Sequence, residues 1–294
     1  MMNRKFKTVI RDGLRLFLGR YLYTWLRFVI THRYIPNFKH PRSMNEKIIH
    51  RKFYDDPKKY SRYTSKYTVR EYVKEAIGEE YLIPLYKAKS FITPADFDEL
   101  PDSFVIKTSN GGGGNNVQIV KNKEDLNLQD VCNRFNGYLK IKAGKGTDEL
   151  FYDLEEPLIL FEKLLLDTTG AVPPDYKFNI IKTGSEPYIF IQVDEDRFSA
   201  PKRSFIDANK NILNFNWGEN LPPISEDFTF PESFKEMLSL AIQLASPFQH
   251  VRVDLYVCND KIFFGELTFC TASGFSSFSD KKYDFEFGTL WDEY

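Results

Sequence analysis

The chain has 294 residues, of which 42% are hydrophobic and 16% aromatic, so it can bury a large core and is not an intrinsically disordered protein. Its 40 Lys and Arg residues balance its 41 Asp and Glu residues, and we expect no nucleic-acid partner. Cys132, Cys258 and Cys270 are widely spaced and form no CxxC pattern, which argues against a disulfide framework or a zinc site and favours reduced thiols in the cytoplasm.

Basic residues are concentrated near the N-terminus. Residues 1–52 contain thirteen Lys and Arg residues but only two acidic ones, Asp12 and Glu46. Such asymmetry indicates a segment that meets an anionic surface. Arginines also interrupt every apolar stretch near the start, so we expect neither a signal peptide nor a transmembrane helix.

Residues 6–31 repeat aromatic and aliphatic side chains at near-helical spacing, which predicts one or two amphipathic helices. We therefore expect residues 1–40 to form a basic helical segment. Two interpretations remain open for it. Residues 1–35 bind peripherally to the inner face of the cytoplasmic membrane, or they pack on their own domain or on another subunit.

The next segment, residues 41–100, is predicted to be a mainly helical subdomain involved in substrate binding. Ser43 and Glu46 form a capping box, so a short helix should follow and end near Asp55. Residues 66–77 form a second amphipathic pattern closed by Gly78, and residues 81–86 are predicted to be a strand.

From residue 101 onward, short apolar strands predominate. We predict strands at residues 104–106, 117–120, 158–161, 176–181, 188–193, 251–257 and 261–267. The last four should form two hairpins. Helices are predicted over residues 124–141 and 231–246.

A glycine-rich loop joins the first two of these strands. It contains Ser109 and four consecutive glycines, Gly111, Gly112, Gly113 and Gly114, and Lys107 stands immediately before it. Many backbone N–H groups without side-chain bulk can close over phosphates, and a lysine at the end of a buried strand suits an anion. The loop lacks both the Walker and the Rossmann spacing. The alternative is a surface hairpin.

Polar residues follow two further strands. Glu162, Lys163 and Leu164 end the strand at 158–161, where backbone groups can read an adenine edge; the alternative is a solvated Glu-Lys pair. Asp175 is placed to accept from ribose hydroxyls and Lys177 to reach a phosphate. Arg203, in the loop after the next strand, is a candidate for holding a transferred phosphoryl group or an anionic substrate.

The last hairpin carries the most specific constellation. Alternation places Arg252 and Asp254 on one face of one strand, opposite Glu266 and Thr268 on its partner. Two facing carboxylates repel unless a cation joins them, and magnesium, completed by nucleotide phosphates, is the natural candidate. A structural salt bridge between Arg252 and Glu266 is the alternative.

Together these features resemble the ATP-grasp superfamily, and more narrowly its TupA-like branch, which is found in capsule and cell-surface polysaccharide biosynthesis. The resemblance covers about residues 40–280. The motifs that carry it are MNEKI (44–48), KYTVREYV (66–73), PPDYKF (173–178), VRVDLY (251–256) and GELTF (265–269).

The resemblance implies an α+β ATP-grasp fold in which antiparallel sheets and helices hold a nucleotide between two subdomains, a small lid of about 101–160 and a large metal-binding part of about 161–294. It assigns Lys66 and Lys107 to the phosphates, with the glycine loop covering them. It assigns Glu162 to the adenine hinge and Asp175 to the ribose, while Asp254 and Glu266 would hold Mg²⁺. The superfamily often has Asn at the position of Thr268, the predicted third ligand. Arg252, Lys177 and Arg203 complete the predicted catalytic set.

The implied activity is an ATP- and Mg²⁺-dependent ligation of a carboxylate to an amine through an acyl phosphate. The branch suggests a uronic acid of a surface polysaccharide as the carboxylate and an amino acid or similar compound as the amine. Two alternatives are a glycosyltransferase, for which Asp194 and Asp196 give a formal D-x-D pattern, and a non-catalytic nucleotide-binding protein.

Overall fold

The structure is a computed structural model that describes residues 4–111, 116–167, 170, 172–184, 186–195 and 200–294. The helices are α1 (Arg4–His32), α2 (Met44–Tyr54), α3 (Ser61–Thr64), α4 (Val69–Ala76), α5 (Leu128–Tyr138), α6 (Ala143–Thr147), α7 (Phe234–Ala245) and α8 (Lys281–Leu290). The strands are β1 (Leu85–Lys89), β2 (Phe104–Thr108), β3 (Val117–Val120), β4 (Ile159–Glu162), β5 (Asp175–Ile181), β6 (Tyr188–Glu195), β7 (Lys202–Ile206), β8 (His250–Cys258) and β9 (Lys261–Thr268). The predicted α+β class with antiparallel sheets is confirmed.

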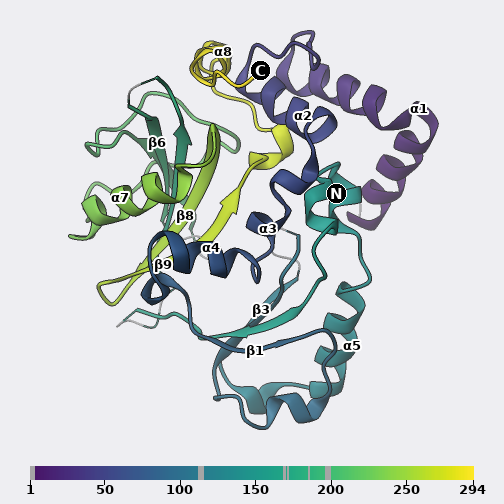
Figure 1. Cartoon of the computed structure of the whole chain (residues 1–294), viewed down its shortest axis with the longest axis vertical. Coiled ribbons are helices and arrows are strands. Elements are labelled where there is room, and N and C mark those ends of the chain that lie inside the picture. The colour runs from purple at the N-terminus through teal and green to yellow at the C-terminus, as the bar shows by residue number, and fades with distance from the viewer. Residues whose placement is uncertain (1–3, 112–115, 168–169, 171, 185, 196–199) are drawn as a thin grey trace.

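A four-stranded sheet in the order β1-β4-β2-β3 forms the smaller lobe, at the bottom of Figure 1. Alternate residues of β2 are fully buried, and Phe104 and Ile106 pack with Val131 and Phe135 of α5 in one apolar core. The opposite face of the sheet is thereby left to face the rest of the molecule.

A five-stranded sheet in the order β7-β6-β5-β8-β9 forms the larger lobe. Its central strand, β5, is buried at every residue, as expected for a strand covered on both faces. Helix α7 packs on the sheet through Phe234, Met237 and Leu244, and residues from α2, α4 and α8 extend the same core (Figure 1). In the register of the last hairpin, Arg252 faces Thr268 and Asp254 faces Glu266, which confirms the predicted juxtaposition.

The capping box at the start of α2 is confirmed: Ser43 accepts from the backbone N–H of Glu46, and the Glu46 carboxylate accepts from the backbone N–H of Ser43. The strand predicted at 81–86 is wrong in position. Residues 79–81 form a 3-10 turn, and β1 begins only after Pro84, which has no N–H group to give to a ladder.

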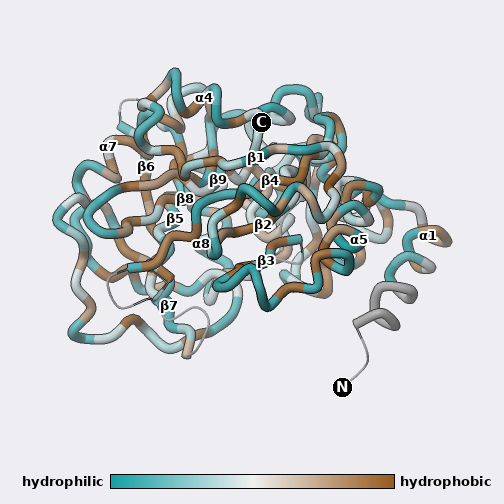
Figure 2. Tube along the Cα trace, turned by 90° about the horizontal axis from the view of Figure 1, so that it is seen from below, coloured by the Kyte–Doolittle hydropathy of each residue, from teal (hydrophilic) through white to brown (hydrophobic). Residues whose placement is uncertain are grey.

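The N-terminal helix α1 lies at the edge of the molecule, away from both sheets in Figures 1 and 2. Gly19, at φ 76°, divides it into two helical stretches. Phe28 is fully buried against Phe38 and Ile49, and Tyr21 packs edge-on against Phe38. No described helix is long and apolar enough to cross a membrane.

Candidate functional site

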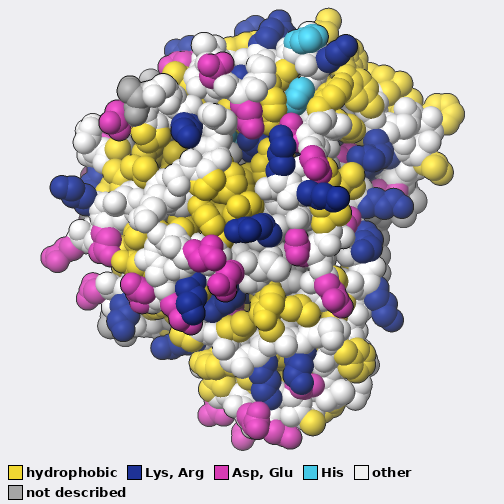
Figure 3. Space-filling model, viewed as in Figure 1, with side chains coloured by type: hydrophobic (Ala, Val, Ile, Leu, Met, Phe, Trp, Pro, Cys, Tyr) yellow, Lys and Arg dark blue, Asp and Glu magenta, His cyan; other side chains and the backbone are white. Residues whose placement is uncertain are grey.

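A cleft of about 670 Å³ lies between the two sheets. Strands β2, β3 and β4 supply one wall, and β5, β8 and β9 supply the other. This volume is in the range of small-molecule sites, which are 300–1,000 Å³ in order of magnitude. Figure 3 shows basic and acidic side chains side by side across the middle of the molecule, between the lower lobe and the body.

One part of the cleft is apolar. Val117 and Ile119 of β3 are 37% and 39% exposed, and Val172 is 40% exposed, yet all three line this one cleft together with Val105 and Leu164. Apolar side chains from both lobes therefore face one another across a space that a planar base can fill. A base bound there would remove the apolar surface of these side chains from water. The backbone N–H of Lys163 is already bonded to the carbonyl of Pro84 at 2.9 Å.

Two lysines stand beside this apolar part. Lys107 Nζ lies 2.5 Å from Glu162, and Arg70 lies 3.9 Å from the same carboxylate. Lys66 Nζ donates to the carbonyl of Gly111 at 2.7 Å. Burial lowers the pKa of Lys66, and the nearby charge of Lys107 lowers it further. These cations outnumber the one buried carboxylate among them, so a bound polyanion would find favourable positive charge here.

The next part of the cleft is a chain of alternating charges. Lys177 pairs with Asp175 and, at 3.1 Å, with Asp194, which in turn accepts from Arg203 at 2.6 Å. Burial alone would raise the pKa of Asp194, but Arg203 and Lys177 outweigh it and the pKa lies below its usual value. These side chains reach one another because β5 and β6 are antiparallel neighbours, with Asp175 opposite Asp194.

Arg252 lies between the two predicted metal ligands. It donates to Asp254 at 2.6 and 2.7 Å and to Glu266 at 2.8 Å, and Thr268 donates to Glu266 at 2.9 Å. Burial raises the pKa of Asp254 to about 6 despite the opposing charge of Arg252. Burial would also raise the pKa of Glu266, but Arg252 and Lys66 outweigh it and the pKa lies below its usual value.

A second cavity, of about 600 Å³, adjoins the cleft and shares Lys177, Arg252 and Glu266 with it. Lys202 and Arg203 line it from β7, and Trp217 adds an aromatic surface. The two spaces are therefore joined at one carboxylate and two cations.

Most of the predicted site residues are brought together. Those lining the cleft are Lys66, Lys107, Glu162, Leu164, Asp175, Lys177, Arg252, Asp254 and Glu266. Those lining only the second cavity are Gly111, Arg203 and Thr268. The structure places Ser109 differently: its buried hydroxyl accepts from the backbone N–H of Leu158 at 2.9 Å and faces neither space. Gly112, Gly113 and Gly114 lie outside the described residues.

Sequence reasoning missed the apolar wall and much of the second cavity. Val117 and Ile119 alternate with Gln118 and Val120, so their pattern indicates only a strand with one solvent-facing side. Trp217 lies in an irregular segment without periodicity. The turn at Thr271–Gly274 places Ala272 and Ser273 at positive φ angles of 46° and 59°, and no residue type at these positions signals that conformation.

The donor set fits Mg²⁺ held jointly with a nucleotide. Asp254 and Glu266 offer carboxylate oxygens from paired positions, which hard cations prefer. Within the described part of the chain, no group of three or more His, Cys, Asp or Glu side chains can hold a metal ion alone. Phosphate oxygens would have to complete the shell.

A protein-family model described as TupA-like ATPgrasp matches residues 46–291. Among solved structures, D-alanine–D-alanine ligase from Helicobacter pylori is 16% identical at a TM-score of 0.45 and is matched over 79% of this chain and 61% of its own. Biotin carboxylase from Campylobacter jejuni is 12% identical at a TM-score of 0.42, and the match covers 70% of this chain and 40% of the carboxylase. L-amino acid ligase from Bacillus licheniformis is 11% identical at a TM-score of 0.41, and the match covers 72% of this chain and 43% of the ligase.

This chain thus spans about half the length of the solved structures that it matches. No curated protein matches it. The family match covers most of the chain, includes both walls of the cleft and leaves out α1. The chain therefore belongs to the TupA-like ATP-grasp family.

Proposed function

We propose that this protein is an ATP- and Mg²⁺-dependent carboxylate–amine ligase. The observation that carries the proposal is the meeting of two cavities at Lys177, Arg252 and Glu266. The cleft suits ATP because it has an apolar part beside a group of cations. The second cavity, which we call the acceptor cavity, suits the carboxylate that receives the phosphoryl group.

A carboxylate is a poor electrophile, so the proposed reaction first transfers the terminal phosphoryl group of ATP to a carboxylate oxygen and releases ADP. An amine then attacks the carbonyl carbon of the acyl phosphate, phosphate leaves, and the amine loses a proton. Lys66 and Lys107 bind the phosphates, while Lys177 and Arg252 stabilise negative charge at the junction of the two cavities. Mg²⁺, when held by Asp254 and Glu266, adds positive charge at the phosphates.

The proposed division into subdomains follows the two sheets. We assign the lid to the β1-β4-β2-β3 sheet with α5, and the metal-binding part to the larger sheet. β1 lies within residues 41–100 and is nevertheless the edge strand of the small sheet, since it pairs with β4. The lid therefore draws on both segments.

For the acceptor we propose a uronic acid of a cell-surface polysaccharide or its precursor, joined to an amino acid or similar amine. Lys202 and Arg203 support an anionic acceptor, and the Trp217 surface supports a sugar ring. No observation favours the glycosyltransferase alternative, because Asp194 is engaged by Lys177 and Arg203, and Asp196 lies outside the described residues.

The test is ADP release by the purified protein with ATP and Mg²⁺. Single uronic acids, such as glucuronic or galacturonic acid, are offered with and without a mixture of amino acids. The proposal predicts ADP release that depends on the uronic acid, and an amide product by mass spectrometry. ADP release that depends on other carboxylates but never on a uronic acid would overturn the acceptor assignment.

We also propose that the protein works in the cytoplasm and binds the inner face of the cytoplasmic membrane through residues 1–35. The exposed apolar residues of α1 support this, as Leu16, Phe17 and Ile30 are 88%, 87% and 77% exposed. Figure 3 shows hydrophobic side chains at the edge where Figure 1 places α1. The basic charge available to lipids is smaller than the sequence predicts, because Arg15, Arg20 and Arg27 make contacts within the protein.

A further inference from the structure

Residues 143–149, which we call the wall segment, form part of the acceptor cavity. Ala143, Thr147 and Glu149 line that cavity directly. The segment turns sharply at Asp148, which ends α6 in the left-handed region at φ 65°. Non-glycine residues are uncommon in this region, although Asp adopts it more readily than most, so the contacts of Asp148 help to fix the position of this wall.

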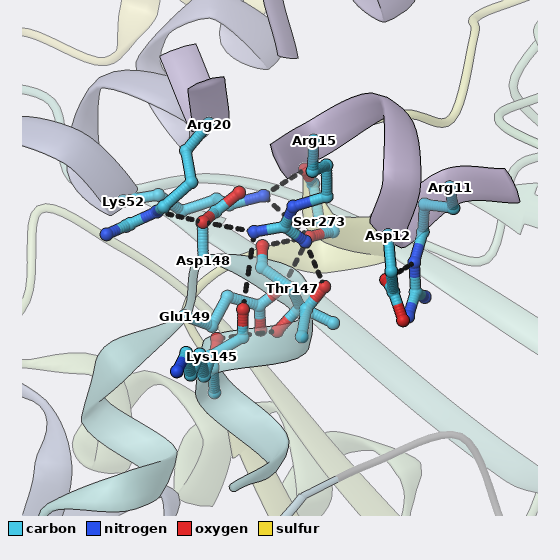
Figure 4. A network of polar contacts seen from close by, with 12 residues as sticks. Arg11, Asp12, Arg15, Arg20, Lys52, Lys145, Thr147, Asp148, Glu149 and Ser273 are labelled. Atoms are coloured by element: carbon cyan, nitrogen blue, oxygen red, sulfur yellow. Dashed lines mark hydrogen bonds and ion pairs between the residues drawn. The ribbon is translucent and has the colours of Figure 1, made fainter. Parts of the chain in front are cut away.

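Helix α1 fixes Asp148 from more than a hundred residues away. Arg15 and Arg20 both bind its carboxylate, at 2.6 and 2.5 Å, and that side chain is only 4% exposed. Arg15 also donates to the carbonyls of Gly146 and, at 3.3 Å, Lys145. Figure 4 shows the two arginines reaching down from α1 onto the end of α6.

The same cluster continues into the opposite side of the acceptor cavity. Ser273 donates to Glu149 at 2.5 Å, and Lys52 donates to the hydroxyl and carbonyl of Ser273 at 2.7 and 3.1 Å. Ser273 is itself strained at positive φ and lines the cavity. One continuous polar cluster, drawn in Figure 4, thus joins α1, the wall segment and the turn at Thr271–Gly274.

We infer that Arg15 and Arg20 of α1 are positioning residues of the acceptor cavity, which they close by holding Asp148 and the wall segment in place. The helix lies outside the residues 46–291 that match the family, and its arginines act on the acceptor cavity through the wall segment. Loss of both arginines removes the two ion pairs that hold a buried carboxylate, and the wall segment then opens more often. The part that concerns substrate binding rests on the proposed function.

A first test needs no substrate. Cys270 lines the acceptor cavity and is only 4% exposed, so its thiol reports opening of that cavity. In a Cys132→Ser/Cys258→Ser background it is the sole thiol, and its reaction rate with the thiol reagent DTNB is measured. Arg15→Ala/Arg20→Ala should raise that rate about tenfold or more, while Arg15→Lys/Arg20→Lys should largely restore it.

The matched control is Arg11→Ala, because Arg11 pairs only with the exposed Asp12 among the contacts described for it. The free energy of unfolding of every variant is also measured. Global unfolding is the cause if the rate increase in the Ala variant equals the increase in its unfolded fraction, and that outcome also overturns the inference. An unchanged DTNB rate in Arg15→Ala/Arg20→Ala overturns the inference.

A second test uses the ADP-release assay. The Ala variant should raise KM for the uronic acid about tenfold while leaving KM for ATP unchanged, because the arginines act on one cavity only. Equal increases in both constants would overturn the inference. If DTNB reaction accelerates but no uronic acid supports turnover in wild type, the proposed acceptor is wrong and the positioning of the wall by α1 still stands.

Discussion

Arg252 shows how a single side chain organises the predicted metal site. It binds both carboxylates that the hairpin brings together, so its positive charge holds Asp254 and Glu266 close to one another. The predicted salt bridge between Arg252 and Glu266 is present, and the predicted magnesium site uses the same Glu266 carboxylate together with Asp254. Glu266 is 37% exposed and faces the cleft, which leaves it accessible to a cation that arrives with the nucleotide.

Glu266→Gln should therefore reduce uronic-acid-dependent ADP release at least about 100-fold, the scale of losing one preorganised charge at the reacting phosphate. The fold should persist, since Asp254 still neutralises Arg252. Rates at saturating Mg²⁺ and melting temperatures check this. Glu99→Gln is the control, because Glu99 is an exposed carboxylate paired with Lys87, and neither residue lines the cleft. Full activity of Glu266→Gln would remove Glu266 from the metal site.

His250 predicts a pH dependence of stability. It is completely buried, and burial together with the charges of Arg51 and Arg252 holds its pKa well below the usual value. Protonation therefore favours the unfolded chain. The free energy of unfolding should fall as pH decreases below about 6.5, by up to about 1.4 kcal/mol per pH unit from this group.

Urea unfolding of the wild type and of His250→Phe at about pH 7 and about pH 5 measures this contribution. The variant keeps a ring against Trp291 but has no titrating group. The wild type should lose more stability between the two pH values than the variant does. Equal losses would show that His250 is not the responsible group.

At the scale of secondary structure, helix α8 packs on the start of α2 through a glycine. A Cβ at Gly288 would lie 2.3 Å from the carbonyl of Arg42 and 2.5 Å from Ser43 Cα. Gly288→Ala should therefore destabilise the protein by roughly 1–3 kcal/mol, because backbone atoms on both sides would have to separate.

Gly137→Ala in α5 is the matched control. A Cβ there meets nothing within 4 Å, so this change should stabilise the protein by roughly 0.5–1 kcal/mol through helix propensity alone. Thermal or urea unfolding distinguishes the two. Equal effects of the two substitutions would mean that the contact between α8 and α2 is loose.

The elements that sequence reasoning predicted well are those with their own local signal. The capping box starts α2, and the turn at Asn259 and Asp260, both at positive φ, joins β8 to β9. By contrast, β7 begins with Lys202 and Arg203, whose charges interrupt any strand pattern, and it forms because β6 lies beside it. Alternation correctly predicted that Arg252 and Asp254 lie opposite Thr268 and Glu266. The apolar wall depends on how two lobes meet, which no local pattern encodes.

At the scale of the whole molecule, α1 presents two different faces. Arg15, Arg20 and Phe28 bind the body, while the apolar residues that support membrane contact point away from it. We expect the full-length chain to pellet with anionic lipid vesicles. Phe17→Ser/Ile30→Ser should abolish pelleting. Added salt should weaken the pelleting of the wild type only partly, because burial of apolar side chains does not depend on screening.

The control variant is Phe91→Ser/Ile212→Ser, which removes two side chains of similar exposure, 63% and 67%, that lie outside α1. It should pellet like the wild type. If wild type and both variants all stay in solution, the membrane proposal fails and α1 serves only the protein itself.

The central claim is that ATP binds with Mg²⁺ in the cleft between the two sheets, and the thermal shift of the intact protein in millimolar ATP and Mg²⁺ tests it most directly. A ligand that binds only the folded state stabilises it by about 2.7 kcal/mol when its concentration is a hundred times Kd, and this stabilisation raises the melting temperature. We predict a clear upward shift for wild type and a much smaller one for Lys107→Ala, which removes a cation from the cleft. No shift for the wild type, or equal shifts for wild type and Lys107→Ala, would contradict this account.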